Sequence, residues 1–269
     1  MLVRYLQDLP TWAMALSVCA VAVIATMIAQ GILHRLWRFD SRTKLNEVAG
    51  FLIAVVGVVY AVLLASIAIL VLERHQRADV AVEAEAGEVS NLFGTSVGLP
   101  PEIALHMRSV ITDYANTVIE DEWPEMTSGV PPESGWQDKG WEKVSALREL
   151  LLGSNPTEEV HTIAVERSLE QIDELADARR DRIFTTGSGL AGLVWAVVTA
   201  GGAITVGLGL FFGLPSWRGH LLMVDMLSLS IALVFVLIIA MDRPFVGESG
   251  VTAKPFLRVM AEIEGFGER

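Results

Sequence analysis

One acidic residue, Asp225, lies within a long apolar run, about one turn inside a stretch from about residue 221 to 241. A charged side chain in hydrocarbon is costly and usually faces a cavity or a partner. Asp225 could therefore bind a cation, relay a proton or pair with Arg218. Alternatively, it lies at the water interface, if the span begins at Leu227 instead. The residue types alone leave both interpretations open.

A second candidate site is a face of small residues along the run of residues 48–72. Steps of three and four place its members on one side of a helix: Gly50, Ala54, Gly57, Ala61, Ala65 and Ala68. Small residues let membrane helices approach closely. This face therefore either packs against a neighbouring helix or lines a narrow pore in an oligomer.

Asn46 and Glu47 open that run and are further pore-lining candidates. A carboxylate in the first turn of a helix is stabilised by the helix dipole, and this effect alone would explain an acidic residue at position 47. In an oligomer, a ring of Glu47 side chains would instead form a pore mouth that favours cations.

The third apolar run has a similar small-residue face, and the sequence favours tight packing of the second and third runs against each other. The residues on that face are Gly192, Ala196, Ala200, Ala203 and Gly207, with Gly201 and Gly202 beside it.

No residue pattern indicates catalysis, a cofactor or a metal site. The acidic cluster around Trp123 lacks the ligand spacing of an EF-hand and predicts a solvated loop; its members are Glu120, Asp121, Glu122 and Glu125. The five histidines are dispersed, without zinc-type spacing. A net charge of −12 argues against nucleic acid as a partner. We therefore expect a protein that is not an enzyme.

Four apolar runs are long enough to cross ~30 Å of hydrocarbon. They cover about residues 12–33, 48–72, 189–214 and 221–241 of this 269-residue chain, which is 52% hydrophobic. The predicted fold is all-α: an integral membrane protein with four transmembrane helices and a helical soluble insert between the second and third. The expected parts are a first helix pair (1–72), an acidic insert (73–187), a second pair (188–241) and a tail (242–269).

The insert has the periodicity of helices. One apolar stripe comprises Ile103, Met107, Val110, Ile111, Tyr114 and Val118, and a second comprises Val160, Ile163, Ile172, Leu175 and Ile183. A further helix is expected over about residues 141–152, after a surface loop over 124–140. No helix-breaking residue follows Leu72, so the second span should continue to about Leu92. The helix that starts near Thr157 could likewise run into the third span, bent near residues 187–189.

Basic residues near the span ends suggest an orientation. Nine lie on the side of the termini and insert, against five on the other side: Arg35, Arg38, Arg42, Lys44 and Arg218. That count favours a cytoplasmic insert and termini, although the higher density in the loop after the first span argues the opposite way.

Asp242, Arg243, Pro244 and Phe245 close the last span. Proline stops a helix, so the segment is either a simple stop signal or a structural lock between the last span and the insert. This motif, with Gly247 after it, and the opening at residues 46–51 (NEVAGF) and 58–65 (VVYAVLLA) resemble a bacterial bestrophin-like family of unknown function.

The resemblance to true bestrophins is more distant. It implies a homo-oligomer, pentameric by that resemblance, in the bacterial inner membrane, with the second span lining a path for permeant ions and the insert forming a vestibule. The second span has Phe51 and Tyr60 but no tight phenylalanine cluster, so no bestrophin-type aromatic gate is identified. The acidic insert makes a cation pathway credible. The alternative is a non-conducting sensor or scaffold that recruits partners through the insert.

Overall fold

The computed structural model describes residues 9–36, 46–187, 189–214 and 216–267. These residues form α-helices joined by short 3₁₀ and π-helical segments, and no strand occurs among them. Four helices are long and apolar enough to cross a membrane, which confirms the predicted all-α fold with four spans. Arg38, Arg42 and Lys44, used above to predict orientation, lie outside the described residues, as does Arg4, one of the nine basic residues on the side of the termini and insert.

The chain forms two compact units. A membrane unit comprises residues 1–73, 189–242 and 247–249, and a bundle unit comprises residues 74–188, 243–246 and 250–269. The apolar runs belong to the first, and nearly all of the predicted insert belongs to the second. The C-terminal helix α11 (Lys254–Gly267) also belongs to the bundle unit.

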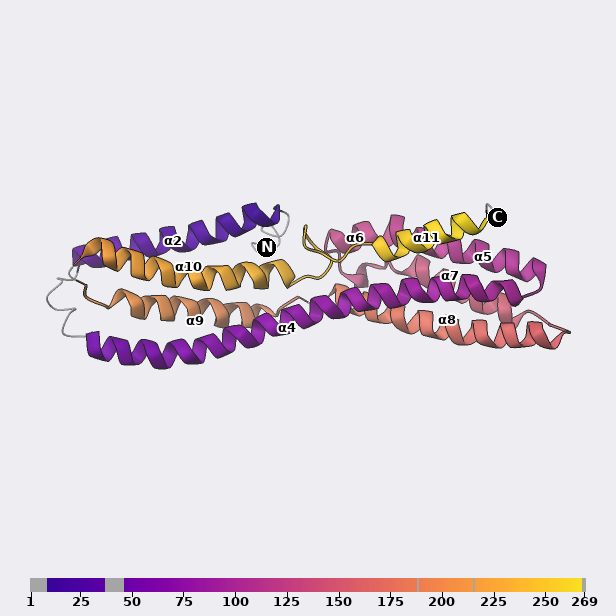
Figure 1. The fold of residues 1–269 in the computed structure, drawn as a ribbon, viewed down its shortest axis with the longest axis horizontal. Helices are drawn as coiled ribbons and strands as arrows, with labels where there is room; N and C mark the ends of the chain where they lie inside the picture. Colours follow the sequence, from indigo (N-terminus) through magenta and orange to yellow (C-terminus); the bar gives the residue numbers. More distant parts are fainter. Residues whose placement is uncertain (1–8, 37–45, 188, 215, 268–269) are drawn as a thin grey trace. The chain divides into compact units, whose positions relative to one another are not determined.

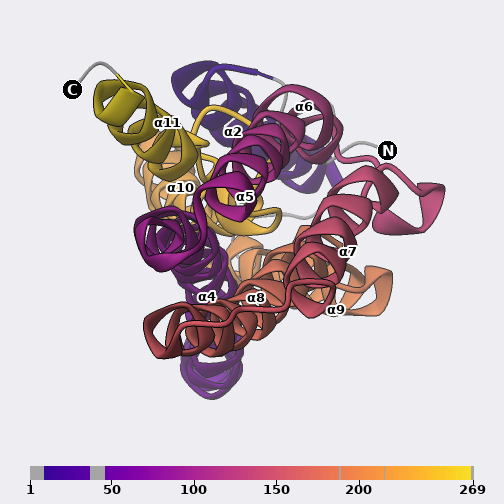
Figure 2. The ribbon, with the colours of Figure 1, turned by 90° about the vertical axis from the view of Figure 1, so that its right-hand side faces the viewer.

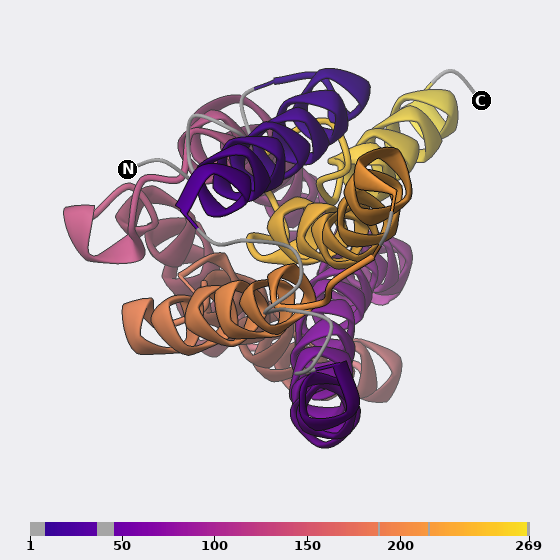
Figure 3. The same cartoon turned by 90° about the vertical axis from the view of Figure 1, so that its left-hand side faces the viewer.

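Among the described residues of the membrane unit there are four helices: α2 (Thr11–Leu36), the first part of α4 (Asn46–Thr95), α9 (Gly192–Leu210) and α10 (Trp217–Met241). Helix α10 lies beside α2 along most of its length and also contacts α9, as Figures 1 and 3 show. The α4 segment packs on α9 and α10 through Tyr60, Leu64, Ile67 and Val71.

The bundle unit, seen end-on in Figure 2, combines the second part of α4 with α5 (Pro101–Asn116), α7 (Asp138–Leu152), α8 (Glu159–Thr186) and α11. One apolar core joins them. It includes Val82 and Leu92 of α4, Met107 and Ile111 of α5, Leu147 of α7, Ile172 and Leu175 of α8 and Phe256 of α11.

The two predicted helix continuations have different outcomes. Helix α4 runs without interruption from Asn46 to Thr95, because no proline or helix-stop signal follows Leu72. By contrast, α8 ends at Thr186 and α9 begins at Gly192. The expected helix from the insert into the third span is therefore broken, and Gly187 follows its last residue.

The insert's apolar stripes are buried only in part. Met107, Ile111 and Tyr114 are fully buried, as expected. In the second stripe Ile172 and Leu175 are buried, whereas Val160 and Ile163 are 57% and 60% exposed. The expected loop over 124–140 includes most of helix α6 (Trp123–Thr127), the 3₁₀ turn η3 (Pro132–Ser134) and the start of α7.

Candidate functional site

The small-residue face of α4 is left largely uncovered in the membrane unit. Ala54, Ala61 and Ala65 are exposed and Gly57 is half-buried. At ~100° per residue, this face lies about a quarter-turn round the helix from the packed face that contains Tyr60. A third face, of bulky apolar residues such as Val59, is also exposed. The two ends of the face are half-buried: Ala68 packs on the Tyr60 cluster, and a Cβ atom added at Gly50 would lie 3.8 Å from the Phe212 ring. Only the middle of the small-residue face is therefore left without close contact in its own unit.

Helices α4 and α9 pack through other residues. A Cβ atom added at Gly201 would lie 2.6 Å from the Tyr60 ring, and one at Gly202 would lie 2.9 Å from its hydroxyl oxygen. The Tyr60 hydroxyl donates to the Val198 carbonyl at 3.1 Å. The expected close packing of the second and third spans occurs, but the contact is between Tyr60 and the pair Gly201 and Gly202, not between the two small-residue stripes. On the predicted stripe of α9, Gly192, Ala196, Ala200 and Ala203 are exposed and Gly207 is half-buried.

Asn46 ties the start of α4 to the end of the α9 segment. Its amide nitrogen donates to the Gly213 carbonyl at 3.0 Å, and its amide oxygen accepts from the Gly213 N–H at 2.8 Å. These two bonds give Asn46 a structural role at the helix start. Glu47, the next residue, is exposed in the first turn of α4.

Asp225 faces α2. Its Oδ1 accepts from the Thr26 hydroxyl at 2.8 Å and from the Gln30 amide nitrogen at 3.3 Å. Within the described residues Asp225 makes no ion pair with Arg218, whose side chain is exposed. Helix α10 begins at Trp217, so Asp225 lies about 12 Å along the helix axis from its first residue. Asp225 therefore contacts polar partners on α2, and its position inside the span rather than at the water interface stays a prediction.

The closing motif contributes to both units. The Oδ1 of Asp242 accepts from the Leu190 N–H at 2.7 Å, within the membrane unit. In the bundle unit, Phe245 is buried and meets the Trp123 ring edge-to-face, with 5.7 Å between ring centroids. Pro244 accepts from the Val251 N–H at 2.7 Å. The proposed role of Asp242, Arg243, Pro244 and Phe245 as a lock stays a prediction.

The bundle unit contains a buried ion network that the sequence reading missed. Arg182 donates from Nε to Glu85 at 2.5 Å and from Nη2 to Glu122 at 2.6 Å. Arg179 donates two bonds to Glu122, at 2.5 and 3.0 Å. The Tyr114 hydroxyl donates to Glu85. All five side chains are fully buried or nearly so, and the two arginines balance the two glutamates.

The network determines which of its members are charged. Burial lowers the pKa of Arg182, but the attraction of Glu85 and Glu122 outweighs burial and the pKa is raised overall. The pKa of Tyr114 lies well above its ordinary value because of burial and the nearby Glu85 charge. The arginine therefore remains a cation and the tyrosine remains a neutral hydrogen-bond donor.

Local backbone geometry makes this network possible. Glu122 ends a π-helical segment, Thr117–Glu122, that lies two residues before Pro124. Proline lacks a backbone N–H and disturbs the regular ladder, and π-segments occur frequently at functional sites. Glu122 is buried, whereas Glu120 and Asp121 are exposed. The prediction of a solvated acidic cluster is therefore wrong for Glu122.

Gly140 provides room for one of the arginines. A Cβ atom at this position would lie 2.2 Å from Nη2 of Arg179. The same nitrogen donates to the Gln137 carbonyl at 2.7 Å. The start of α7 thus contacts the Arg179 guanidinium, and the Tyr114 ring centroid lies 5.5 Å from the guanidinium carbon.

A signal for the network was present in the sequence. Glu85 continues the step of three and four that relates Ala78, Val82, Val89 and Leu92, all of which are buried. Arg179 and Arg182 continue the stripe of Ile172 and Leu175 in the same way. When two helices each have a charged residue in register with an apolar stripe, and the two charges have opposite sign, the pattern indicates a buried ion pair.

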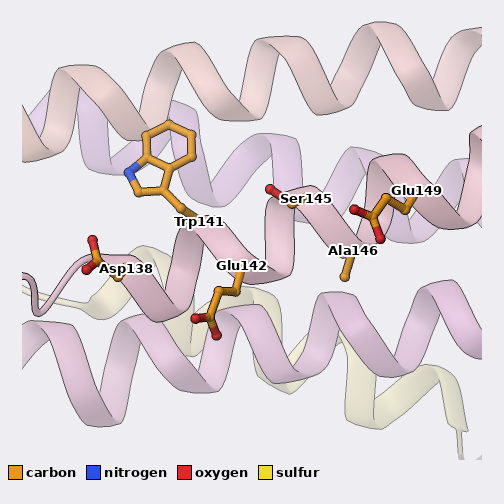
Figure 4. Close-up of a pocket in the computed structure, with 6 residues that line it drawn as sticks. All are labelled: Asp138, Trp141, Glu142, Ser145, Ala146 and Glu149. Atoms are coloured by element: carbon orange, nitrogen blue, oxygen red, sulfur yellow. The ribbon is translucent and has the colours of Figure 1, made fainter.

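Surface hollows in the bundle unit do not add a catalytic constellation. Figure 4 shows one whose six lining residues all come from α7, among them Asp138, Glu142 and Glu149. These carboxylates project from one exposed helix face, and no group of metal-ligating side chains gathers among the described residues. We assign this hollow to the solvated acidic face of α7.

A family profile for the Bestrophin-like domain matches residues 20–256, from within α2 to within α11. Comparison with curated proteins and with solved structures gave no match. The profile covers most of the chain, including part of α2, the other three apolar helices in full and the buried network. The resemblance noted in the opening and closing motifs is thereby confirmed, and this chain belongs to the Bestrophin-like family.

Proposed function

We propose that this chain is the subunit of an oligomeric ion channel in which the small-residue face of α4 lines the pore. Family membership supports a membrane protein of channel-like type. The observation that carries the proposal is the uncovered face of Ala54, Ala61 and Ala65, next to the packed face of Tyr60. Exposed bulky residues such as Val59 suit contact with lipid, whereas a small-residue face suits close approach to other copies or to a narrow axis.

Charge favours cations as the permeant ions. Residues 74–187 contain 22 acidic and 10 basic residues, so this segment accounts for the whole net charge of −12. An acidic vestibule raises the local concentration of cations. We place the protein in the bacterial inner membrane, with the bundle unit and both termini in the cytoplasm, on the excess of basic residues near the span ends on that side.

Gly57→Trp tests the pore assignment. A Cβ atom added at Gly57 has no atom within 4 Å, so the variant should keep the fold of the subunit while it fills the pore. We expect loss of cation flux in proteoliposomes. Val59→Trp, on the exposed bulky face, is the matched control and should conduct as the wild type does.

The outcomes separate the possible roles. Unchanged flux in Gly57→Trp refutes a pore on this face. Loss of the oligomer in that variant assigns the face to a subunit contact instead. If the wild type passes neither cations nor chloride across pH and Ca²⁺ conditions, the channel proposal fails. The exposed carboxylates of α7 then favour a scaffold that recruits a basic partner, which pull-down with the full chain would detect.

A further inference from the structure

The contact between the apolar helices α2 and α10 contains a cluster of three polar side chains, Thr26, Gln30 and Asp225. Thr26 and Gln30 lie one turn apart on α2 and both contact Oδ1 of Asp225 on α10. Gln30 is fully buried and Thr26 is 5% exposed. Helices α2, α9 and α10 contain no acidic residue other than Asp225. The carboxyl group is therefore the single acidic group on these three helices.

No basic side chain neutralises this carboxylate among the described residues. The titratable groups of α2 are Cys19, His34 and Arg35, and those of α10 are Arg218 and His220 besides Asp225 itself. Helix α9 has none. Of these, only Asp225 lies on the Thr26–Gln30 contact. Within the part of the chain that the structure describes, the hydrogen bonds to this carboxyl group come from neutral donors.

Gln30 supplies an independent observation. Its amide nitrogen points at Asp225, but its amide oxygen Oε1 is buried and has no hydrogen-bond partner within the described residues. An ionised carboxylate can only accept hydrogen bonds, so it cannot satisfy this oxygen. A protonated carboxyl group has one O–H donor. It can pair with the amide through two bonds at once, accepting from Nε2 and donating to Oε1.

We propose that Asp225 is a proton-binding site in which the neutral carboxyl group forms a cyclic acid–amide pair with Gln30. The proton comes from water, and its uptake removes one negative charge from the membrane interior, where an uncompensated charge is unfavourable. The Thr26 hydroxyl lies 2.8 Å from the same carboxyl oxygen and 2.8 Å from the Val23 carbonyl, so its single proton is divided between these two acceptors. Loss of the proton leaves both a bare carboxylate and the unpaired Gln30 oxygen, so deprotonation weakens the α2–α10 contact. This inference does not depend on whether α4 lines a pore.

Infrared spectroscopy of the full-length protein in lipid tests the proposal. The wild type at neutral pH should show the carbonyl stretch of a protonated carboxylic acid, shifted in D₂O. Asp225→Asn, which keeps the shape of the neutral acid, should lose this band. Glu47→Gln, at an exposed carboxylate, is the control and should retain it.

Gln30→Leu provides a second, independent readout. Removal of the amide donor should move the remaining carbonyl band to higher wavenumber, which assigns the band to the pair even if Asp225→Asn folds poorly. Absence of the band in the wild type at neutral pH overturns the proposal. So does a band that persists in Asp225→Asn or one that Gln30→Leu leaves unshifted.

Discussion

Replacement of Arg182 by methionine should destabilise the bundle unit strongly. Methionine keeps an unbranched side chain but removes one of two positive charges. Glu85 and Glu122 then share Arg179, whose Nη1 lies 3.7 Å from Glu85. The network changes from neutral to a net charge of −1 in a site without solvent exposure. Removal of one member of a buried ion pair costs about 3–5 kcal/mol.

Native-state hydrogen exchange measures this effect where it occurs. At about 1.4 kcal/mol per factor of ten, the loss corresponds to a roughly 150-fold to 4,000-fold increase in the opening equilibrium. The amides of α8 around Ile172 and Leu175 report it, because they belong to the core beside the network. The measurement uses the full-length protein in lipid or detergent, followed by mass spectrometry.

A surface pair supplies the control. Arg148 of α7 pairs with Asp173 of α8 at 2.5 Å, and both side chains are largely exposed. Arg148→Met should therefore change stability by less than about 1 kcal/mol. Addition of Glu122→Gln to Arg182→Met restores neutrality and should recover part of the lost protection. If Arg182→Met exchanges no faster than Arg148→Met, the electrostatic reasoning is refuted.

Three further changes test neighbouring features. Gly140→Ala should lower the free energy of unfolding by about 1–3 kcal/mol, because the alanine methyl group would overlap the Arg179 guanidinium. A thermal unfolding midpoint equal to that of the wild type would contradict this. Phe245→Ala removes the ring that packs on Trp123 and should cost about 3–5 kcal/mol, seen as faster proteolysis of the bundle unit. Burial lowers the pKa of His75, so stability should be complete above pH about 6.5 and should decline as pH falls. His75→Gln should flatten that decline, measured by denaturation from pH 7 to 5.

The four spans could be predicted because membrane insertion depends on local composition. Transfer of about 20 apolar residues into hydrocarbon is favourable whatever lies elsewhere in the chain. The uninterrupted helix α4 could be predicted for the same reason: helix continuation depends on local sequence, and residues 73–77 lack a helix-stop signal. By contrast, the predicted continuation of α8 into α9 was wrong, because a glycine-rich segment allows a helix either to bend or to end, and packing decides between the two.

Which polar side chains pair with one another was decided by the tertiary structure. Glu85 and Arg182 are 97 residues apart, and Gln30 and Asp225 are 195 apart. A charged residue is almost never fully buried unless it is paired, and its partner is known only from the packing of α4 on α8 or of α2 on α10. Composition and periodicity determined the helices, the spans and the acidic character of the insert. The register of Glu85, Arg179 and Arg182 with apolar stripes already indicated their burial. Only the folded chain determined that Glu122 joins them and which side chains pair, because pairing depends on every neighbour of a side chain and not on its place in the sequence.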